Sequence, residues 1–197
     1  SEERYPVLYL FHGGGQDHTA FMARTAFPPL ARRHEMIVVM PAADRNYTTQ
    51  SVEAQTRYHD YVAMELVDYV DAHYRTIASQ QGRAIGGISM GGRIASMTAL
   101  QHADRFSAVG AFSPAIRPDA EEAVRNVPEA APFFYVSCGT QDSLLPINRE
   151  FVSWLMARDL AHEYREAPGL GHTWALWDEQ IAVFFDLLEA RGFRPPS

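Results

Sequence analysis

Gly86-Gly87-Ile88-Ser89-Met90-Gly91-Gly92 is the stretch of sequence that decides the fold. It contains the pattern Gly-x-Ser-x-Gly. The apolar run Arg83–Ser89 leads into it, and a helix-like run follows from Ile94. This order of strand, sharp turn and helix is the context in which a serine hydroxyl is lifted clear of a sheet. Side chains two residues before and after Ser89 would collide as strand and helix close up, and Gly87 and Gly91 remove them.

A phosphate-binding loop is the alternative interpretation of this glycine-rich turn. A Walker A loop requires Gly-Lys followed by Ser or Thr, and a dinucleotide loop requires Gly-x-Gly-x-x-Gly. Neither pattern is present in the turn. The helix that begins after Ser89 would also favour negative charge developing at the serine. The turn therefore favours a nucleophilic serine.

Six strand-like runs alternate with amphipathic segments, which predicts an α/β fold with a mostly parallel sheet and helices on both faces. The first five runs are nearly continuous in apolar or small residues, so we expect both of their faces to be covered. The last run is more polar, and we expect it at an edge. The runs are Pro6–His12, Met36–Pro41, Arg83–Ser89, Ser107–Ser113, Phe133–Cys138 and His162–Glu166.

Helical spacing of apolar residues predicts the segments between these runs. One helix is expected from Thr56 to Ile77, with Tyr61, Tyr69 and Tyr74 on its buried stripe. A second is expected from Pro146, and a third carries Trp174 and Trp177. Residues 113–132 are predicted to form a short cap-like connection over the strand ends. We expect residues 1–197 to form a single domain.

Charge and composition limit the classes of partner. The 197 residues are 47% hydrophobic and carry a net charge of −7, which argues against a nucleic acid or an anionic membrane as partner. No apolar run approaches the roughly 18 residues of a membrane span. The first residues lack the pattern of a signal peptide, so we expect a cytoplasmic location, with a secreted mature form as the alternative. The single cysteine, Cys138, is expected to be a small buried residue.

A serine hydroxyl needs a base to take its proton, and the base is usually a histidine held by a carboxylate. In this fold the chain order is serine, acid, histidine. His172 lies in a glycine-rich loop between the last strand and the last helix, so it is the predicted base; His102 and His162 fit less well. Asp142 follows the strand Phe133–Cys138 and is the predicted acid, with a turn or cap residue as the alternative.

A tetrahedral intermediate needs two backbone N–H donors. We expect one from Met90, after the serine, and one from the loop Phe11-His12-Gly13-Gly14-Gly15, where Gly14 is the main candidate and Gly13 or Gly15 the alternatives. Gly13, Gly15 and Trp174 are further candidates for substrate contact. His12 is expected to hold the loop by a hydrogen bond. No clustered ligand set is present in the sequence, so neither a metal nor a cofactor is implied.

These residues together resemble the α/β-hydrolase superfamily. The sequence is most similar to the esterase branch that includes tributyrin esterases, S-formylglutathione hydrolases, feruloyl esterases and mycolyltransferase-like proteins. The stretches that carry the resemblance are residues 5–18, Gly87-Ile-Ser-Met-Gly-Gly92, Cys138-Gly-Thr-Gln-Asp142 and Gly171-His-Thr-Trp174. That branch usually has additional strands before the first one here, so the resemblance implies an N-terminally shortened sheet. An uncovered sheet edge would favour a homodimer.

The predicted activity is that of a serine carboxylesterase acting on a small-molecule ester with a short or aromatic acyl group, through an acyl-enzyme on Ser89. An acyltransferase or a thioesterase could use the same residues. A non-catalytic binding protein on a hydrolase scaffold is the alternative from another class, and the set of Ser89, Asp142 and His172 in the expected order argues against it.

Overall fold

A computed structural model describes residues 3–44, 47–116 and 131–196 of the chain. Six strands form one sheet in the order β2-β1-β3-β4-β5-β6, and every neighbouring pair is parallel. All six predicted strands are confirmed to within two residues at each end. They are β1 (Val7–Phe11), β2 (Ile37–Val39), β3 (Arg83–Ile88), β4 (Ala108–Phe112), β5 (Phe133–Gly139) and β6 (His162–Ala167).

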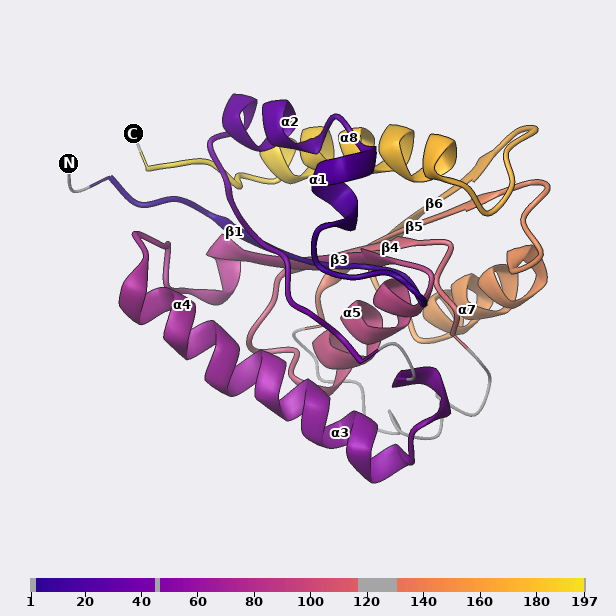
Figure 1. The fold of residues 1–197 in the computed structure, drawn as a ribbon, viewed down its shortest axis with the longest axis horizontal. Helices are drawn as coiled ribbons and strands as arrows, with labels where there is room; N and C mark the ends of the chain where they lie inside the picture. The colour runs from indigo at the N-terminus through magenta and orange to yellow at the C-terminus, as the bar shows by residue number, and fades with distance from the viewer. Residues whose placement is uncertain (1–2, 45–46, 117–130, 197) are drawn as a thin grey trace.

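Helices cover both faces of the sheet, as predicted (Figure 1). One face carries α1 (Ala20–Arg24), α2 (Phe27–Arg33) and α8 (Trp174–Ala190). The other carries α3 (Val52–Asp60), a π-helical stretch η2 (Tyr61–Leu66), α4 (Val67–His73), α5 (Met90–Gln101) and α7 (Leu145–Ala157). Two short 3₁₀ turns, η1 (Tyr47–Thr49) and η3 (Gln80–Gly82), complete the described elements.

Two apolar clusters form the core, because side chains of a strand alternate between the faces of the sheet. In β1, Val7, Tyr9 and Phe11 belong to the cluster under α5, whereas Leu8 and Leu10 belong to the cluster under α8. All five side chains are buried. Burial on both faces explains the nearly continuous apolar sequence of this strand.

Two predictions need correction. The strand β2 was expected to be covered on both faces, yet it is a half-buried edge strand, because no described strand pairs with its outer side. The helix expected at Thr56–Ile77 begins at Val52, after the cap residue Ser51, and ends at His73. Tyr61, Tyr69 and Tyr74 are exposed rather than buried, because Val62, Val67 and Val70 form the buried face of the helix and Tyr74 lies beyond its end. The polar strand β6 lies at the other edge, as predicted.

Most of the predicted cap-like connection, 113–132, lies outside the described residues. In the described part of the chain, no helix is long and apolar enough to cross a membrane.

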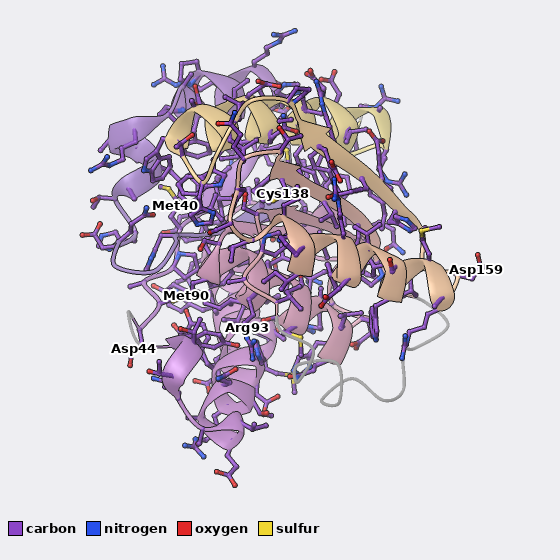
Figure 2. The ribbon with its side chains drawn as sticks, turned by 90° about the vertical axis from the view of Figure 1, so that its right-hand side faces the viewer. Met40, Asp44, Met90, Arg93, Cys138 and Asp159 are labelled. Atoms are coloured by element: carbon purple, nitrogen blue, oxygen red, sulfur yellow. The ribbon has the colours of Figure 1, made fainter. Side chains whose placement is uncertain are left out.

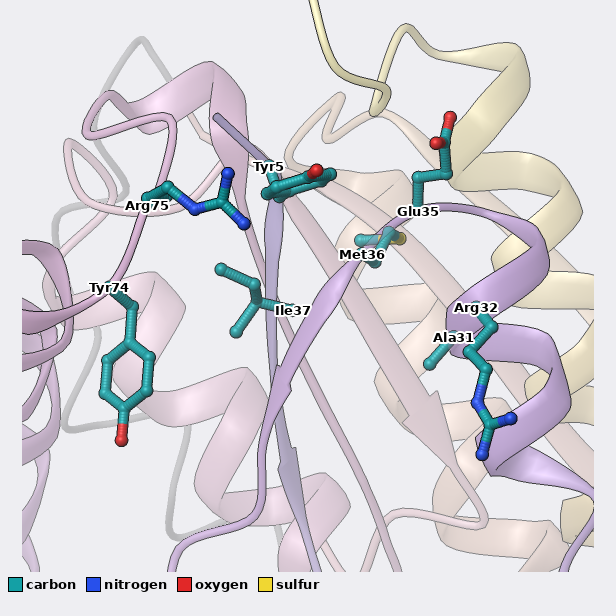
Figure 3. A pocket seen from close by; sticks show the side chains of 8 residues that line it. All are labelled: Tyr5, Ala31, Arg32, Glu35, Met36, Ile37, Tyr74 and Arg75. Carbon is teal, nitrogen blue, oxygen red and sulfur yellow. The ribbon is translucent and has the colours of Figure 1, made fainter. Parts of the chain in front are cut away.

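An open pocket of about 510 Å³ lies where β2 begins, at the end of the sheet opposite to the carboxyl ends of the strands (Figure 3). Tyr5, Met36, Ile37, Tyr74 and Arg75 are among the residues that line it. The guanidinium of Arg75 lies over the ring of Tyr5, 5.3 Å from its centroid. The outer edge of β2 borders this hollow, so the surface beside the unpaired strand is partly apolar.

The expected homodimer becomes testable at this edge. The Ile37 amide donates to the Pro6 carbonyl, so the next amide, that of Val38, faces away from β1. Proline is tolerated in an edge strand where the lost N–H faced outward. We expect sedimentation velocity to show a concentration-dependent dimer for the wild type and a monomer for Val38→Pro. A wild-type chain that stays monomeric at every concentration would contradict the prediction.

Candidate active site

The loops that carry the predicted site residues all leave the sheet at the carboxyl ends of its strands. Ser89 follows β3, Asp142 follows β5, and His172 lies between β6 and α8. Figure 2 views the molecule from this end and labels Met90 and Cys138 near the strand tips. In open parallel sheets, ligands bind in this position.

The backbone of Ser89 has the strained conformation expected of an exposed nucleophile. Its φ is 53° and its ψ is −115°, a left-handed conformation that non-glycine residues rarely adopt. Hydrogen bonds hold it there: its amide donates to the Phe112 carbonyl, and its carbonyl accepts from the amides of Arg93 and Ala115. Strain of this kind persists only where the surroundings impose it, and it concentrates at functional sites.

Gly87 and Gly91 permit this turn by the close approach of three backbones. A Cβ on Gly87 would overlap the backbone of Gly91, which confirms the predicted collision between strand and helix. A Cβ on Gly91 would overlap the carbonyl oxygens of Phe11 and His12. The helix α5 therefore also packs directly against the loop that follows β1.

Asp142 and His172 form a hydrogen-bonded pair. The Nδ1 of His172 lies 2.8 Å from Oδ2 of Asp142, whose side chain is fully buried, whereas that of His172 is 32% exposed. An ionised carboxylate can only accept, so Nδ1 carries the proton. Because Nδ1 is engaged, Nε2 is the nitrogen available to a reacting hydroxyl.

The surroundings of Asp142 favour its ionised form. Burial raises the pKa of this carboxyl, but hydrogen bonds from His172 and the Leu144 amide, together with the Ser113 hydroxyl, outweigh burial, so the pKa lies below its usual value. Its Oδ1 accepts from the Leu144 amide at 2.8 Å. Asp142 is thus also the turn residue before α7, which was the alternative prediction from the sequence. Its Oδ2 bonds to His172 and its Oδ1 to the Leu144 amide, so one residue has both roles.

Contacts between the loops after β5 and β6 bring this pair together. The amide of Gln141 donates to the Leu170 carbonyl, and the amide of Thr140 donates to the Ala167 carbonyl. A Cβ on Gly139 would overlap that Leu170 carbonyl, so glycine allows the two loops to touch. The other two candidate histidines lie elsewhere: His102 contacts Asp60, and His162 contacts the Leu160 carbonyl.

His12 holds the glycine loop after β1, as predicted. Its Nε2 accepts from the Ala43 amide at 3.0 Å, so its Nδ1 carries the proton and donates to the Gly13 carbonyl at 2.9 Å. The Gly13 amide donates to the side chain of Gln16 at 3.1 Å, so this amide is already engaged. Gly14 and Gly15 are exposed on the tip of the loop. Of the three glycine amides considered, Gly13 is therefore the least suited to bind an oxyanion.

Metal-ligating side chains do not cluster in the part of the chain that the structure describes: no group of three or more His, Cys, Asp or Glu residues is placed to hold a metal ion.

The chain matches the family model Esterase, described as "Putative esterase", over residues 1–179. The chain belongs to this esterase family. It is therefore a carboxylic ester hydrolase on an α/β-hydrolase fold, as the sequence predicted.

The proteins to which this esterase is similar are named as different kinds of hydrolase. It is 21% identical to the acetyl esterase of Caldicellulosiruptor saccharolyticus over 93% of its own length and 83% of the relative's. An S-formylglutathione hydrolase of Staphylococcus aureus is 25% identical, with a TM-score of 0.78 over 94% of this chain and 82% of that one. A ferulic acid esterase is 26% identical, also with a TM-score of 0.78, over 96% and 87%. Other curated relatives are longer, and the esterase spans about a quarter of their length.

Trp174, a predicted substrate contact, is half-buried at the start of α8. It meets Phe21 edge-on, with ring centroids 5.6 Å apart, and Trp177 at 5.2 Å, while Arg24 lies over its ring at 5.9 Å. These contacts fix the beginning of α8 against α1. The proposed contact of Trp174 with substrate stays a prediction.

Three residues near the site were not predicted. Gln16 engages the Gly13 amide, and Ser113 and Trp177 lie beside the Asp142–His172 pair. The position of Ser113, directly after a strand as Ser89 is, was the one signal available in the sequence. Cys138, also near Asp142, is buried as predicted, and burial raises the pKa of its thiol to about 12.

Gly91→Ala should destabilise the esterase by about 2–4 kcal/mol, because the new Cβ would overlap two carbonyl oxygens that cannot move without shifting β1. Gly14→Ala is the matched control, since a Cβ there meets nothing within 4 Å. Urea unfolding monitored by circular dichroism measures both. Equal free energies of unfolding for the two variants would show that the close approach at Gly91 is not a constraint.

Proposed function

We propose that the protein is a serine carboxylesterase in which Ser89 is the nucleophile, His172 the base and Asp142 the acid that orients it. One observation carries the proposal: the 2.8 Å bond between His172 and the buried Asp142 lies at the same end of the sheet as the strained Ser89. Nδ1 of His172 is held by Asp142, so Nε2 is left to take the proton of the serine.

In the proposed reaction, Oγ of Ser89 attacks the ester carbonyl carbon while its proton passes to Nε2 of His172. The tetrahedral intermediate collapses, the bond to the alcohol oxygen breaks, and His172 gives its proton to the leaving alcohol. A water molecule then attacks the acyl-enzyme with His172 again as base, and the acid leaves. The ionised Asp142 stabilises the imidazolium in both halves of the reaction.

The amides of Met90 and Gly14 are the proposed donors to the oxyanion. Met90 is the first residue of α5, where an amide has no acceptor within its own helix. Gly14 lies on the exposed tip of the loop that His12 and Gln16 hold in place. Gly15 is the alternative to Gly14. Donors fixed in this way need no reorganisation when charge develops.

The proposed substrate is a small-molecule ester with a short or an aromatic acyl group. The names of the relatives, acetyl esterase and ferulic acid esterase, support both possibilities. A net charge of −7 speaks against nucleic acid or an anionic membrane as partner. A cytoplasmic location belongs to the same proposal, with secretion as its alternative.

Ser89→Ala should reduce kcat for p-nitrophenyl acetate by about 10⁴- to 10⁶-fold, because no other group can form the acyl-enzyme. Ser96→Ala is a matched control, since Ser96 lies fully buried on the same helix α5 with no partner for its hydroxyl. A fluorophosphonate probe should label the wild type and Ser96→Ala, but not Ser89→Ala. Unchanged turnover in Ser89→Ala would refute the assignment, and a wild type that neither turns over nor is labelled would favour a binding protein.

The acyl preference is measured with a series of esters. We expect kcat/KM to be highest for acetyl or butyryl esters or for methyl ferulate, and to fall at least about tenfold for acyl chains of eight or more carbons, since the predicted 113–132 connection is short for a cover over a long chain. An S-acyl thioester in the series tests the thioesterase alternative. Transfer of the acyl group to added alcohol, measured by product analysis, tests the acyltransferase alternative. A preference for long chains would contradict the proposal.

A further inference from the structure

Two side chains that the proposed reaction does not use lie against the Asp142–His172 pair. Ser113 is the first residue after β4, and Trp177 lies in the first turn of α8. Ser113 is fully buried, and Trp177 is 4% exposed. They come from different elements, 64 positions apart in the chain, and meet only at the site.

Ser113 shares the unusual backbone of the nucleophile. Its φ is 46°, again in the left-handed region, and its amide donates to the Ser137 carbonyl at 2.7 Å. A serine without glycine's conformational freedom is costly here, so its side chain is expected to compensate for the strain. This backbone bond ties Ser113 to β5, the strand that leads into the loop of Asp142.

The indole of Trp177 contacts both Ser113 and His172. Its Nε1 donates to the Ser113 hydroxyl at 3.4 Å. Its ring meets the imidazole of His172 edge-on, with centroids 4.9 Å apart and planes at 89°. Trp177 is therefore held by Ser113 while it limits the rotation of His172.

Hydrogen-bonding capacity determines where the Ser113 proton goes. An indole N–H can only donate, so the hydroxyl accepts from Trp177 and keeps its own proton to give. Ser113 also contributes to the lowered pKa of Asp142, and the thiol of Cys138 is the other group that it influences. A neutral thiol is a weak acceptor, whereas an ionised carboxylate is a strong one. The ionised Asp142 is therefore the stronger of the two candidate acceptors for this proton, and His172 is the remaining titratable group of the cluster.

We propose that Ser113 and Trp177 are positioning residues for His172: the Ser113 hydroxyl holds the Trp177 indole, and the indole ring, edge-on to the imidazole, holds His172 in register with Asp142. The proposal rests on the proposed roles of Asp142 and His172. A positioning role affects proton transfer in the transition state and leaves substrate binding unchanged, so it acts on kcat rather than on KM.

Ser113→Ala and Trp177→Phe each remove the hydrogen bond between the two residues, the first by removing its acceptor and the second by removing its donor. Phenylalanine keeps a ring against His172 but removes the indole N–H. We expect each variant to lower kcat by about 10- to 100-fold with KM within about twofold of the wild type. Because both act through one hydrogen bond, the double variant should lose less than the product of the two single losses.

Ser137→Ala is the matched control, since Ser137 is fully buried in the neighbouring strand β5 and its hydroxyl has no partner among the described residues. It should keep the wild-type kcat. The low-field proton resonance of His172 Nδ1–H gives a readout that general destabilisation would not move: it should broaden or shift in Ser113→Ala and Trp177→Phe, at temperatures where both are folded, and stay unchanged in Ser137→Ala.

Wild-type kcat together with an unchanged resonance in both test variants would overturn the proposal, as would independent losses that multiply in the double variant. If Ser113→Ala fails to fold, Trp177→Phe decides by the same measurements. Failure of the proposed function is distinguishable, because Ser89→Ala would then remain active. Failure of the positioning role alone would leave Ser89→Ala inactive and both test variants fully active.

Discussion

The close approach of β1, β3 and α5 is the constraint on which the rest of the site depends. Gly87 and Gly91 let the three backbones touch, and the contact forces Ser89 into a left-handed conformation that hydrogen bonds from β4 and α5 then maintain. The same contact brings the glycine loop after β1 beside the start of α5. One steric arrangement therefore places both the proposed nucleophile and the backbone amides proposed to stabilise its transition state.

Backbone hydrogen bonds between neighbouring parallel strands continue into the loops that follow the strands. The first amide beyond β3, that of Ser89, donates to Phe112 of β4; the first beyond β4, that of Ser113, donates to Ser137 of β5; and Thr140, after β5, donates to Ala167 of β6. Each strand tip is thus bonded to its neighbour. These backbone bonds hold the proposed nucleophile, Ser113 and the loop of Asp142 at fixed relative positions.

Local signals in the sequence were sufficient for the strands, because apolar runs and glycine spacing are local. Chain order was sufficient to bring Asp142 and His172 together, while the catalytic roles of Ser89, Asp142 and His172 stay predictions. The edge position of β2 was missed, since an apolar run of three to six residues reads the same at an edge as inside a sheet. The engagement of the Gly13 amide by Gln16 and the meeting of Ser113 with Trp177 were missed for another reason. They depend on side-chain geometry that no spacing rule encodes.

The two serines with left-handed backbones, Ser89 and Ser113, lie at the ends of neighbouring strands. A left-handed non-glycine residue costs about 1–3 kcal/mol, and this chain places Ser89 and Ser113 in that conformation at the tips of adjacent strands. At Ser89 the conformation lifts a hydroxyl toward the substrate side. At Ser113 it accompanies a buried hydroxyl that accepts from the indole of Trp177. Strain at the first position exposes the proposed nucleophile. Strain at the second accompanies the contact that, in our proposal, positions the proposed base, so both contribute to preorganisation.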